Sequence, residues 1–497
     1  MSIGVVLGLG AASKLSALAV GIVPIVTFIL CIRERVRDKI RSNALREVAK
    51  FLGLAIISAL AAASFFRIFQ PYAFDGFFSF DTRFLSDLKY LTSVNSGADV
   101  PWVIQWVGRI PLWYPLQSVF WHGMGPPLTS AVAIGITFVI YEIIARGKRF
   151  LLIPLSFVII MLSLVSQQFN PLIRYLLPAY PIAITFGGYG IYRLWKWGEV
   201  RTSLKGKSKA LGRVGQVAAV VLVGGTLFWG TAFVNGIYNN THPRIEASQW
   251  INQNIDSGST ITHQIWDDRL PLNIQGEIEP KLKHVNLDLF RSDRSIDPAT
   301  KIPKVDALLN NLDEADYIVE ASNRLYDSIP RMPSEYPVTT AYYDALFNGQ
   351  LGFELVATFD NSPTLFGVRL SDSGAEETFT VYDHPRVSIW SKSSEWSRTA
   401  AEETLNPFRA TNALNLEPKG ASSNGLLLRP SQTEALQNDL TFNEAFSERG
   451  YLGIGNWIWW LLWLQLAAFA VLPWSTLLFS RLGDGGYGLS KALGFVS

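Results

Sequence analysis

The chain carries several long apolar segments up to residue 236, a mostly polar stretch over 237–453, and one more apolar segment near its end. Because the core of a bilayer is about 30 Å thick, a helix needs roughly 20 apolar residues to cross it. With 49% hydrophobic and only 17% charged residues, the composition also fits a polytopic α-helical membrane protein. The predicted spans are 15–31, 50–68, 127–145, 150–167, 175–192, 214–236 and 454–479.

Basic residues gather in three of the loops between these spans. Seven Lys or Arg lie from Arg33 to Lys50, three lie within 146–149, and seven lie from Arg193 to Arg213. Basic loops stay on the cytoplasmic side of a membrane, so they fix the orientation of the spans. The alternation then places the loop 69–126 and the stretch 237–453 outside the plasma membrane. This topology accounts for the basic clusters, and nucleic acid is not expected as a partner.

The outer stretch has the pattern of a folded domain. Strand and helix patterns alternate there, which predicts an extracytoplasmic α/β domain over 237–392. Residues 393–453 are rich in Ser, Asn, Thr and Glu and predict a loosely ordered connection back to the membrane. The chain thus divides into a transmembrane block (1–236), this domain, the connection, and a final membrane segment (454–497). The predicted helices are 245–255, 305–312 and 340–347, and the predicted strands are 259–265, 317–321, 353–359 and 387–390.

The outward loop 69–126 mixes aromatic and charged residues. One interpretation is an interfacial belt, in which amphipathic side chains rest at the membrane surface. The functional interpretation is a cleft that holds a lipid-linked substrate. Its candidate residues are Asp75, Asp81, Trp102 and Trp106.

Three cations are candidates: Lys14 and Arg174 lie at or close to the outer ends of spans, and Arg109 lies in the loop between them. A charge near the bilayer is costly unless it has a partner, so such residues are functional candidates. A lipid phosphate is a natural partner, because Lys and Arg donate charge-assisted hydrogen bonds to its oxygens. The alternative is that the three side chains snorkel to the headgroups.

The outer domain offers further candidates. Asp267 and Asp268 directly follow a predicted strand, where they would bind a metal, act as an acid and base, or cap a turn. His384 lies in a turn without a metal partner at ligand spacing. No cofactor is evident, and a divalent metal stays open.

Several motifs resemble those of GT-C membrane glycosyltransferases related to protein O-mannosyltransferases and aminoarabinose transferases: Gly8–Leu18, Arg174–Pro178 and Trp250–Ile251. Asp316–Val319, Ser322–Tyr326 and Val381–Pro385 look like the large versions found in Chloroflexi and some archaea. Leu482–Lys491 resembles the opening of a YYY-type membrane module fused to such proteins.

This resemblance implies transfer of a sugar from a polyprenyl-phosphate carrier to an acceptor at the outer face of the plasma membrane. It implies membrane lipid, the polyprenyl-phosphate sugar donor and a second membrane module or subunit as partners. Lys14 and Arg174 match positions that would contact the phosphate. The family's catalytic carboxylate precedes the run that ends at Lys14, so the base is unassigned, and we expect the sequence to be truncated at both ends.

Two other functions stay open. The chain could be a non-catalytic, membrane-anchored protein that binds glycan or a partner subunit. A transporter is a weaker alternative, because the internal repeats typical of transporters are not found. The enzyme hypothesis predicts that Lys14, Arg109 and Arg174 converge on one point.

Overall fold

The computed structural model describes residues 2–37, 44–76, 79–94, 97, 101–202, 207–265, 267–277, 279–291, 293, 302–405, 456–479, 486–488, 490 and 491. The chain forms two compact units, residues 1–418 and 419–497. In the second unit the structure describes α18, Asn456–Leu478, whose Leu461–Leu477 part is apolar but short for a span.

Five helical segments are long and apolar enough to cross a membrane: Leu15–Glu34, Val48–Phe69, Gly125–Arg146, Arg149–Ser166 and Ala210–Asn254. They coincide with five of the predicted spans and confirm that these segments are apolar helices of sufficient length. The predicted span 175–192 is a 3-10 helix, η6 (Ile173–Ala179), followed by α9 (Tyr180–Thr202), which carries charged residues in its second half. The helices are α2 (Ile22–Arg37), α3 (Ala44–Phe69), α7 (Gly125–Arg146), α8 (Leu152–Ser166) and α10 (Lys207–Phe233), with η1 (Leu15–Gly21) before α2 and η5 (Arg149–Leu151) before α8.

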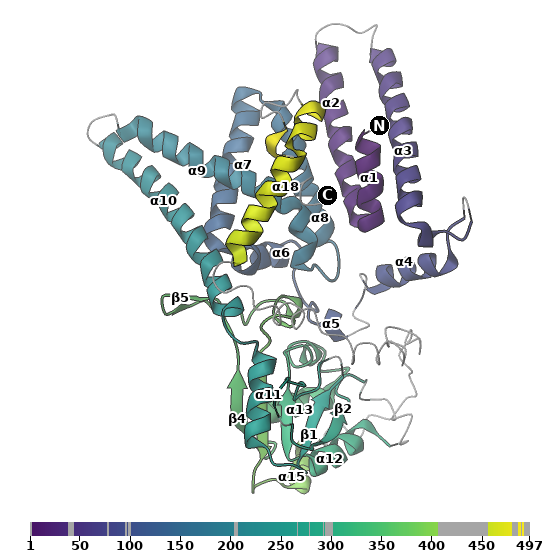
Figure 1. Ribbon diagram of the computed structural model, residues 1–497, viewed down its shortest axis with the longest axis vertical. Coiled ribbons are helices and arrows are strands. Elements are labelled where there is room, and N and C mark those ends of the chain that lie inside the picture. The colour runs from purple at the N-terminus through teal and green to yellow at the C-terminus, as the bar shows by residue number, and fades with distance from the viewer. Residues whose placement is uncertain are drawn as a thin grey trace. The chain divides into compact units, whose positions relative to one another are not determined.

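The helix α1 (Ser2–Ser13) packs tightly on α3 (Figure 1). Glycine makes this approach possible, because a Cβ on Gly4 would lie only 2.0 Å from the Ser58 carbonyl oxygen. Helix α1 ends at Lys14, whose backbone is extended (φ −159°, ψ 119°) before η1 begins. The chain therefore breaks its helical course at Lys14.

Helices α7 and α9 approach as closely. A Cβ on Gly135 would lie 1.8 Å from the Phe186 carbonyl oxygen. At one end of this pair Glu142 is fully buried and forms ion pairs with Arg146 (3.0 Å), Lys148 (2.8 Å) and Arg193 (3.1 Å). The basic residues of two predicted inner loops thus share one carboxylate.

The polar stretch forms a five-stranded sheet in the order β2-β1-β3-β7-β4. Strands β1 and β2 are parallel, as are β1 and β3, whereas β7 runs antiparallel to both β3 and β4. The strands are β1 (Thr260–Gln264), β2 (Lys283–Leu287), β3 (Tyr317–Glu320), β4 (Phe353–Phe359) and β7 (Val387–Lys392), and β5 (Thr364–Leu365) pairs with β6 (Val368–Arg369) outside this sheet.

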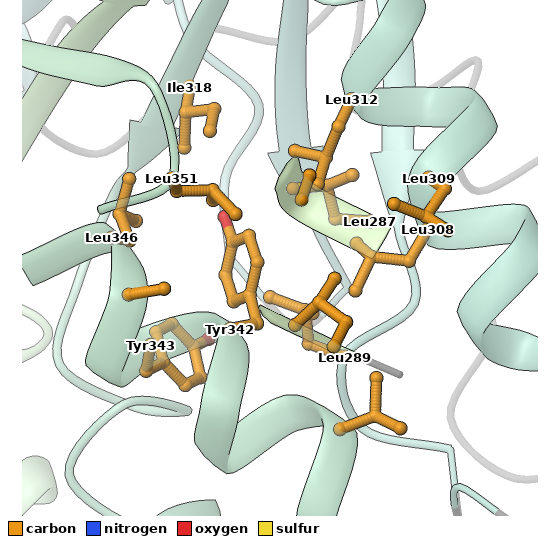
Figure 2. Close-up of a cluster of buried hydrophobic side chains, with 14 of the residues drawn as sticks. Leu287, Leu289, Leu308, Leu309, Leu312, Ile318, Tyr342, Tyr343, Leu346 and Leu351 are labelled. Carbon is orange, nitrogen blue, oxygen red and sulfur yellow. The ribbon is translucent and has the colours of Figure 1, made fainter. Parts of the chain in front are cut away.

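Helices cover both faces of the sheet. Successive residues of a strand point to opposite faces, so neighbouring residues of one strand pack in different cores. Val319 and Ile389 pack with α11 (Pro243–Asn254). Ile318 and Trp390 face the larger core beneath α12 (Lys304–Glu314), α13 (Pro337–Phe347) and α15 (Arg398–Leu405). Figure 2 shows part of this core, where the leucines of α12 face Tyr342 of α13.

The sequence predicts most of this domain correctly. All three helices and all four strands expected there are present, within a few residues of their predicted bounds. Strand β2 and helix α15 are not predicted, and α15 adds Ala401 and Leu405 to the larger core. The rest of the predicted connection, 406–453, lies outside the described residues.

The outward loop is tied to this domain. The short helix α5 (Pro101–Ile104) places Ile104, which is fully buried, in the domain's larger core. At the other junction α10 continues through η7 (Val234–Tyr238) toward α11. The remaining short helices are η3 (Pro71–Ala73), α4 (Thr82–Val94), α6 (Trp113–Ser118), η4 (Val119–Gly123), η8 (Ile329–Arg331) and α14 (Glu377–Thr380).

Candidate functional site

An aromatic cluster forms where the outward loop meets η6. Its buried members come from α5 and the turn after it, from α6 and from the residue before η6, so the outward loop and the start of η6 share it. We call this group the aromatic cluster: Val103, Trp106, Tyr114 and Leu172, with Trp102, Phe169 and Tyr175 packed against them.

The three predicted cations surround the aromatic cluster. Lys14 Nζ lies 4.9 Å from the centroid of the Tyr175 ring, and the Arg174 guanidinium lies 5.9 Å from the same centroid. The Arg109 guanidinium lies 4.0 Å from the Tyr114 centroid, and its Nε donates to the Gln105 carbonyl at 2.6 Å. Cations over aromatic faces are stabilised by the ring quadrupole, which also holds these side chains in place.

A buried glutamate lies next to this group. Glu376 is 2% exposed, and both of its carboxylate oxygens accept the Ile173 N–H at 3.2 Å, at the start of η6. Burial raises the pKa of Glu376 to about 7, although hydrogen bonds from Thr378 and Ile173 and the charges of Arg174 and Arg109 oppose the shift. A carboxyl with this pKa exchanges a proton near neutral pH, as a general acid or base must.

The next residue, Glu377, contacts the outward loop and the α/β domain. The Glu377 N–H donates to Gln105 Oε1 at 2.9 Å, and the Glu377 carboxylate pairs with Arg324 Nε at 2.5 Å. Adjacent glutamates thus connect η6, the outward loop and the α/β domain. The sequence does not single out Glu376, because its burial depends on residues about two hundred positions away.

Among the buried polar atoms of the described residues that make no hydrogen bond are the Tyr180 hydroxyl and His122 Nδ1. The His122 ring packs 5.7 Å from that of Phe379, just after α14 begins, and the Tyr180 hydroxyl lies against Gly123. Buried polar groups normally have partners, so these atoms offer hydrogen-bonding capacity that a polar ligand could use.

The outward-loop candidates fall into two groups. Trp102 and Trp106 belong to the aromatic cluster. Asp75 lies exposed in a turn, and Asp81 caps α4 by accepting the Arg83 N–H at 2.6 Å. Among the residues that the structure describes, neither carboxylate forms an ion pair with Lys14, Arg109 or Arg174.

Asp267 and Asp268 have a shared structural partner. Arg244, at the start of α11, donates to Asp267 Oδ1 and to Asp268 Oδ2, both at 2.9 Å, and to the Ala321 carbonyl at 3.3 Å. Asp267 also accepts the Ser322 hydroxyl at 2.6 Å. The pair therefore joins α11 to the ends of β1 and β3, and its geometry is that of an arginine fork.

His384 lies between two carboxylates. Its Nε2 is 2.9 Å from Asp372 Oδ2, and its Nδ1 is 2.5 Å from Asp383 Oδ1. Burial alone would lower the pKa of His384, but the two hydrogen bonds and charges outweigh it and raise the pKa to about 9. The ring is therefore a cation at neutral pH with both nitrogens occupied. Within the described residues, no group of three His, Cys, Asp or Glu side chains could hold a metal ion.

No protein-family model, curated protein or solved structure matches the chain. The resemblance to GT-C glycosyltransferases therefore rests on the sequence motifs.

Proposed function

We propose that this protein is a membrane glycosyltransferase that transfers a sugar from a polyprenyl-phosphate carrier to an acceptor at the outer face of the plasma membrane. The observation that carries the proposal is the convergence of Lys14, Arg109 and Arg174 on one aromatic cluster. Such cations suit a lipid phosphate, and the aromatic side chains suit the membrane interface.

The proposed chemistry needs a phosphate site and a proton acceptor. Arg174 and Lys14 are exposed, so their charges can reach a phosphate and stabilise the negative charge that develops on it as the sugar departs. Glu376 accepts the N–H of Ile173, the residue before Arg174, and its pKa of about 7 suits removal of a proton from an acceptor hydroxyl. Glu376 itself directly precedes α14, and the charge of Arg174 in η6 acts on it through space.

The test of the phosphate site is binding of polyprenyl monophosphate to the full chain in lipid nanodiscs. Arg174→Ala should weaken binding about ten-fold, and Lys14→Ala with Arg174→Ala about a hundred-fold, as expected for lost charge-assisted hydrogen bonds. Arg213→Ala is the matched control, because Arg213 is an exposed arginine in the first turns of α10 and is not part of the aromatic cluster or its cations. Equal affinities for Arg174→Ala and Arg213→Ala would contradict the proposal.

The second candidate function is a non-catalytic membrane protein that binds glycan or a partner subunit. It is favoured by the absence, in the described part of the chain, of any carboxylate ion-paired with the three cations, and by the engagement of Asp267 and Asp268 with Arg244. A polyprenyl-phosphate hexose with a labelled sugar separates the two. Loss of label from the lipid in the presence of membrane-derived acceptors supports transfer, whereas binding without loss supports the second candidate.

A further inference from the structure

The α/β domain contains a polar pocket that the proposed phosphate site does not use. Its volume is about 360 Å³, within the range of small-molecule sites. Three segments form it: the loop after β3, the segment 360–373 that includes β5 and β6, and the turn before β7. The charged side chains in its wall are Asp327, Asp360, Arg369, Asp372, His384 and Arg386.

The charges of this wall balance. The wall itself holds three carboxylates and three cationic side chains, and His384 is also paired with Asp383, which lies outside the wall. A phosphate or nucleotide site would need an excess of cations, and a site for a basic ligand would need an excess of carboxylates. The pocket therefore suits a ligand without net charge.

Two of the wall's ion pairs hold it in shape. Arg369 Nη2 donates to Asp360 at 2.6 Å and to the Ser362 hydroxyl at 2.9 Å. The second pair is His384 with Asp372. Preformed walls reduce the ordering cost of binding, because fewer side chains must be fixed when the ligand enters.

Other polar groups of the wall form no hydrogen bond with the described residues. Arg386 is exposed and makes no hydrogen bond or ion pair there. Asn323 donates its amide N–H to Asp327 at 2.8 Å, while its Oδ1 is buried and accepts none. The pocket lining therefore offers, within the described residues, a donor and an acceptor without protein partners, which match hydroxyl groups because hydroxyls accept and donate at once. The hydroxyls of Ser371 and Ser373 add to this lining.

We propose that this pocket binds an uncharged carbohydrate of one or two sugar units, with Arg386 and Asn323 as direct hydrogen-bonding partners. The inference does not need the proposed transfer reaction, but it fits with it. Burial dominates and lowers the pKa of Arg109, and Asp327 of the wall acts on this pKa through space and raises it.

The experiment measures saturable binding of methyl α-mannoside, methyl β-glucoside and methyl β-galactoside to the full chain in nanodiscs by saturation-transfer NMR. Glucosamine and galacturonate serve as charged analogues. We expect saturation by at least one neutral glycoside, with weaker binding of both charged analogues. Absence of saturation by all three neutral glycosides, or preference for a charged analogue, would overturn the proposal.

Variants locate the site. Arg386→Ala should weaken binding of the preferred glycoside about ten-fold and Asn323→Ala about three-fold, in keeping with a charged and a neutral hydrogen bond. Arg269→Ala is the control, an exposed arginine of the same domain outside the pocket. Equal effects of Arg386→Ala and Arg269→Ala would overturn the assignment. Polyprenyl-phosphate binding should be unchanged in Arg386→Ala, and it also reports that the variant is folded.

Discussion

The carboxylates at Asp267 and Asp268 differ from Glu376 in how completely the fold neutralises them. Asp267 is 4% exposed and meets a guanidinium and a hydroxyl, whereas Glu376 is 2% exposed and meets a backbone N–H and a threonine hydroxyl. The nearest guanidinium groups act on Glu376 only through space. An adjacent pair of carboxylates can thus be fully engaged by the fold, whereas burial without a counter-ion shifts the pKa of a single carboxylate.

The largest expected effect comes from removing the partner of the pair. Arg244→Ala leaves Asp267 buried without a counter-ion, and breaking such a pair costs about 3–5 kcal/mol of the free energy of unfolding. Thermal unfolding in detergent should show the loss, together with early proteolysis of the α/β domain. Asp268→Asn is the matched control, because Asp268 is 67% exposed and should change stability by less than about 1 kcal/mol. Equal losses of stability in Arg244→Ala and Asp268→Asn would contradict the prediction that burial of Asp267 makes its ion pair with Arg244 important.

Glu376 should make stability fall as pH rises. Its pKa rises from an ordinary 4.5 to about 7 on folding, so the unfolded chain loses this proton first. The stabilisation is fully present below about pH 4.5 and is lost by about pH 7, at up to about 1.4 kcal/mol per pH unit. The melting temperature measured from pH 4 to 6.5, below the range in which His384 titrates, should show this fall in the wild type and not in Glu376→Gln. A parallel fall in both would show that Glu376 is not the titrating group.

His384 should act in a higher pH window. Its pKa rises from 6.5 to about 9, so its contribution is fully present below about pH 6.5 and is lost by about pH 9. We expect a loss of about 2 kcal/mol over this window, because the 32% exposure of Asp383 screens part of the interaction. NMR of labelled histidine should show one ring titrating near pH 9, and Asp372→Asn should lower that pKa. A pKa near 6.5 in the wild type would exclude the ion pairs.

The smallest effect concerns the outward-loop carboxylates. Asp81→Ala removes the cap of α4 and should cost about 1 kcal/mol of stability. Asp75→Ala removes an exposed side chain in the neighbouring turn and should change little. Hydrogen exchange of the first turn of α4 measures the difference. A loss of polyprenyl-phosphate binding in either variant would instead return these residues to the proposed site.

The sequence predicts local features of this protein well and distant pairings poorly. The spans follow from apolar length, and β4 follows from the run Phe353–Phe359, which is rich in residues that favour strands. Strand β2 is missed because Lys283–Leu287 mixes polar and apolar residues without a clear pattern.

The same limit applies to the candidate site. Lys14 and Arg174 stand out because charge at a span end is unusual, and the structure places both beside Tyr175. The ion-pair partner of Asp267 is Arg244, which lies in a preceding helix. The hydrogen-bond donor to Glu376 is the N–H of Ile173, which is 203 residues away along the chain. Pattern alone cannot identify such partners, since tertiary packing brings them together.

The burial of Ile104 within the α/β domain has a practical consequence. A fragment cut at residues 237–405 would lack a fully buried side chain of its own core, together with Val107, which packs beside it. Such a piece would expose an apolar hole and would tend to aggregate when produced without the outward loop. Any attempt to produce the domain in soluble form must therefore graft residues 101–107 onto it, and homologous proteins should exchange loop and domain only as a matched set.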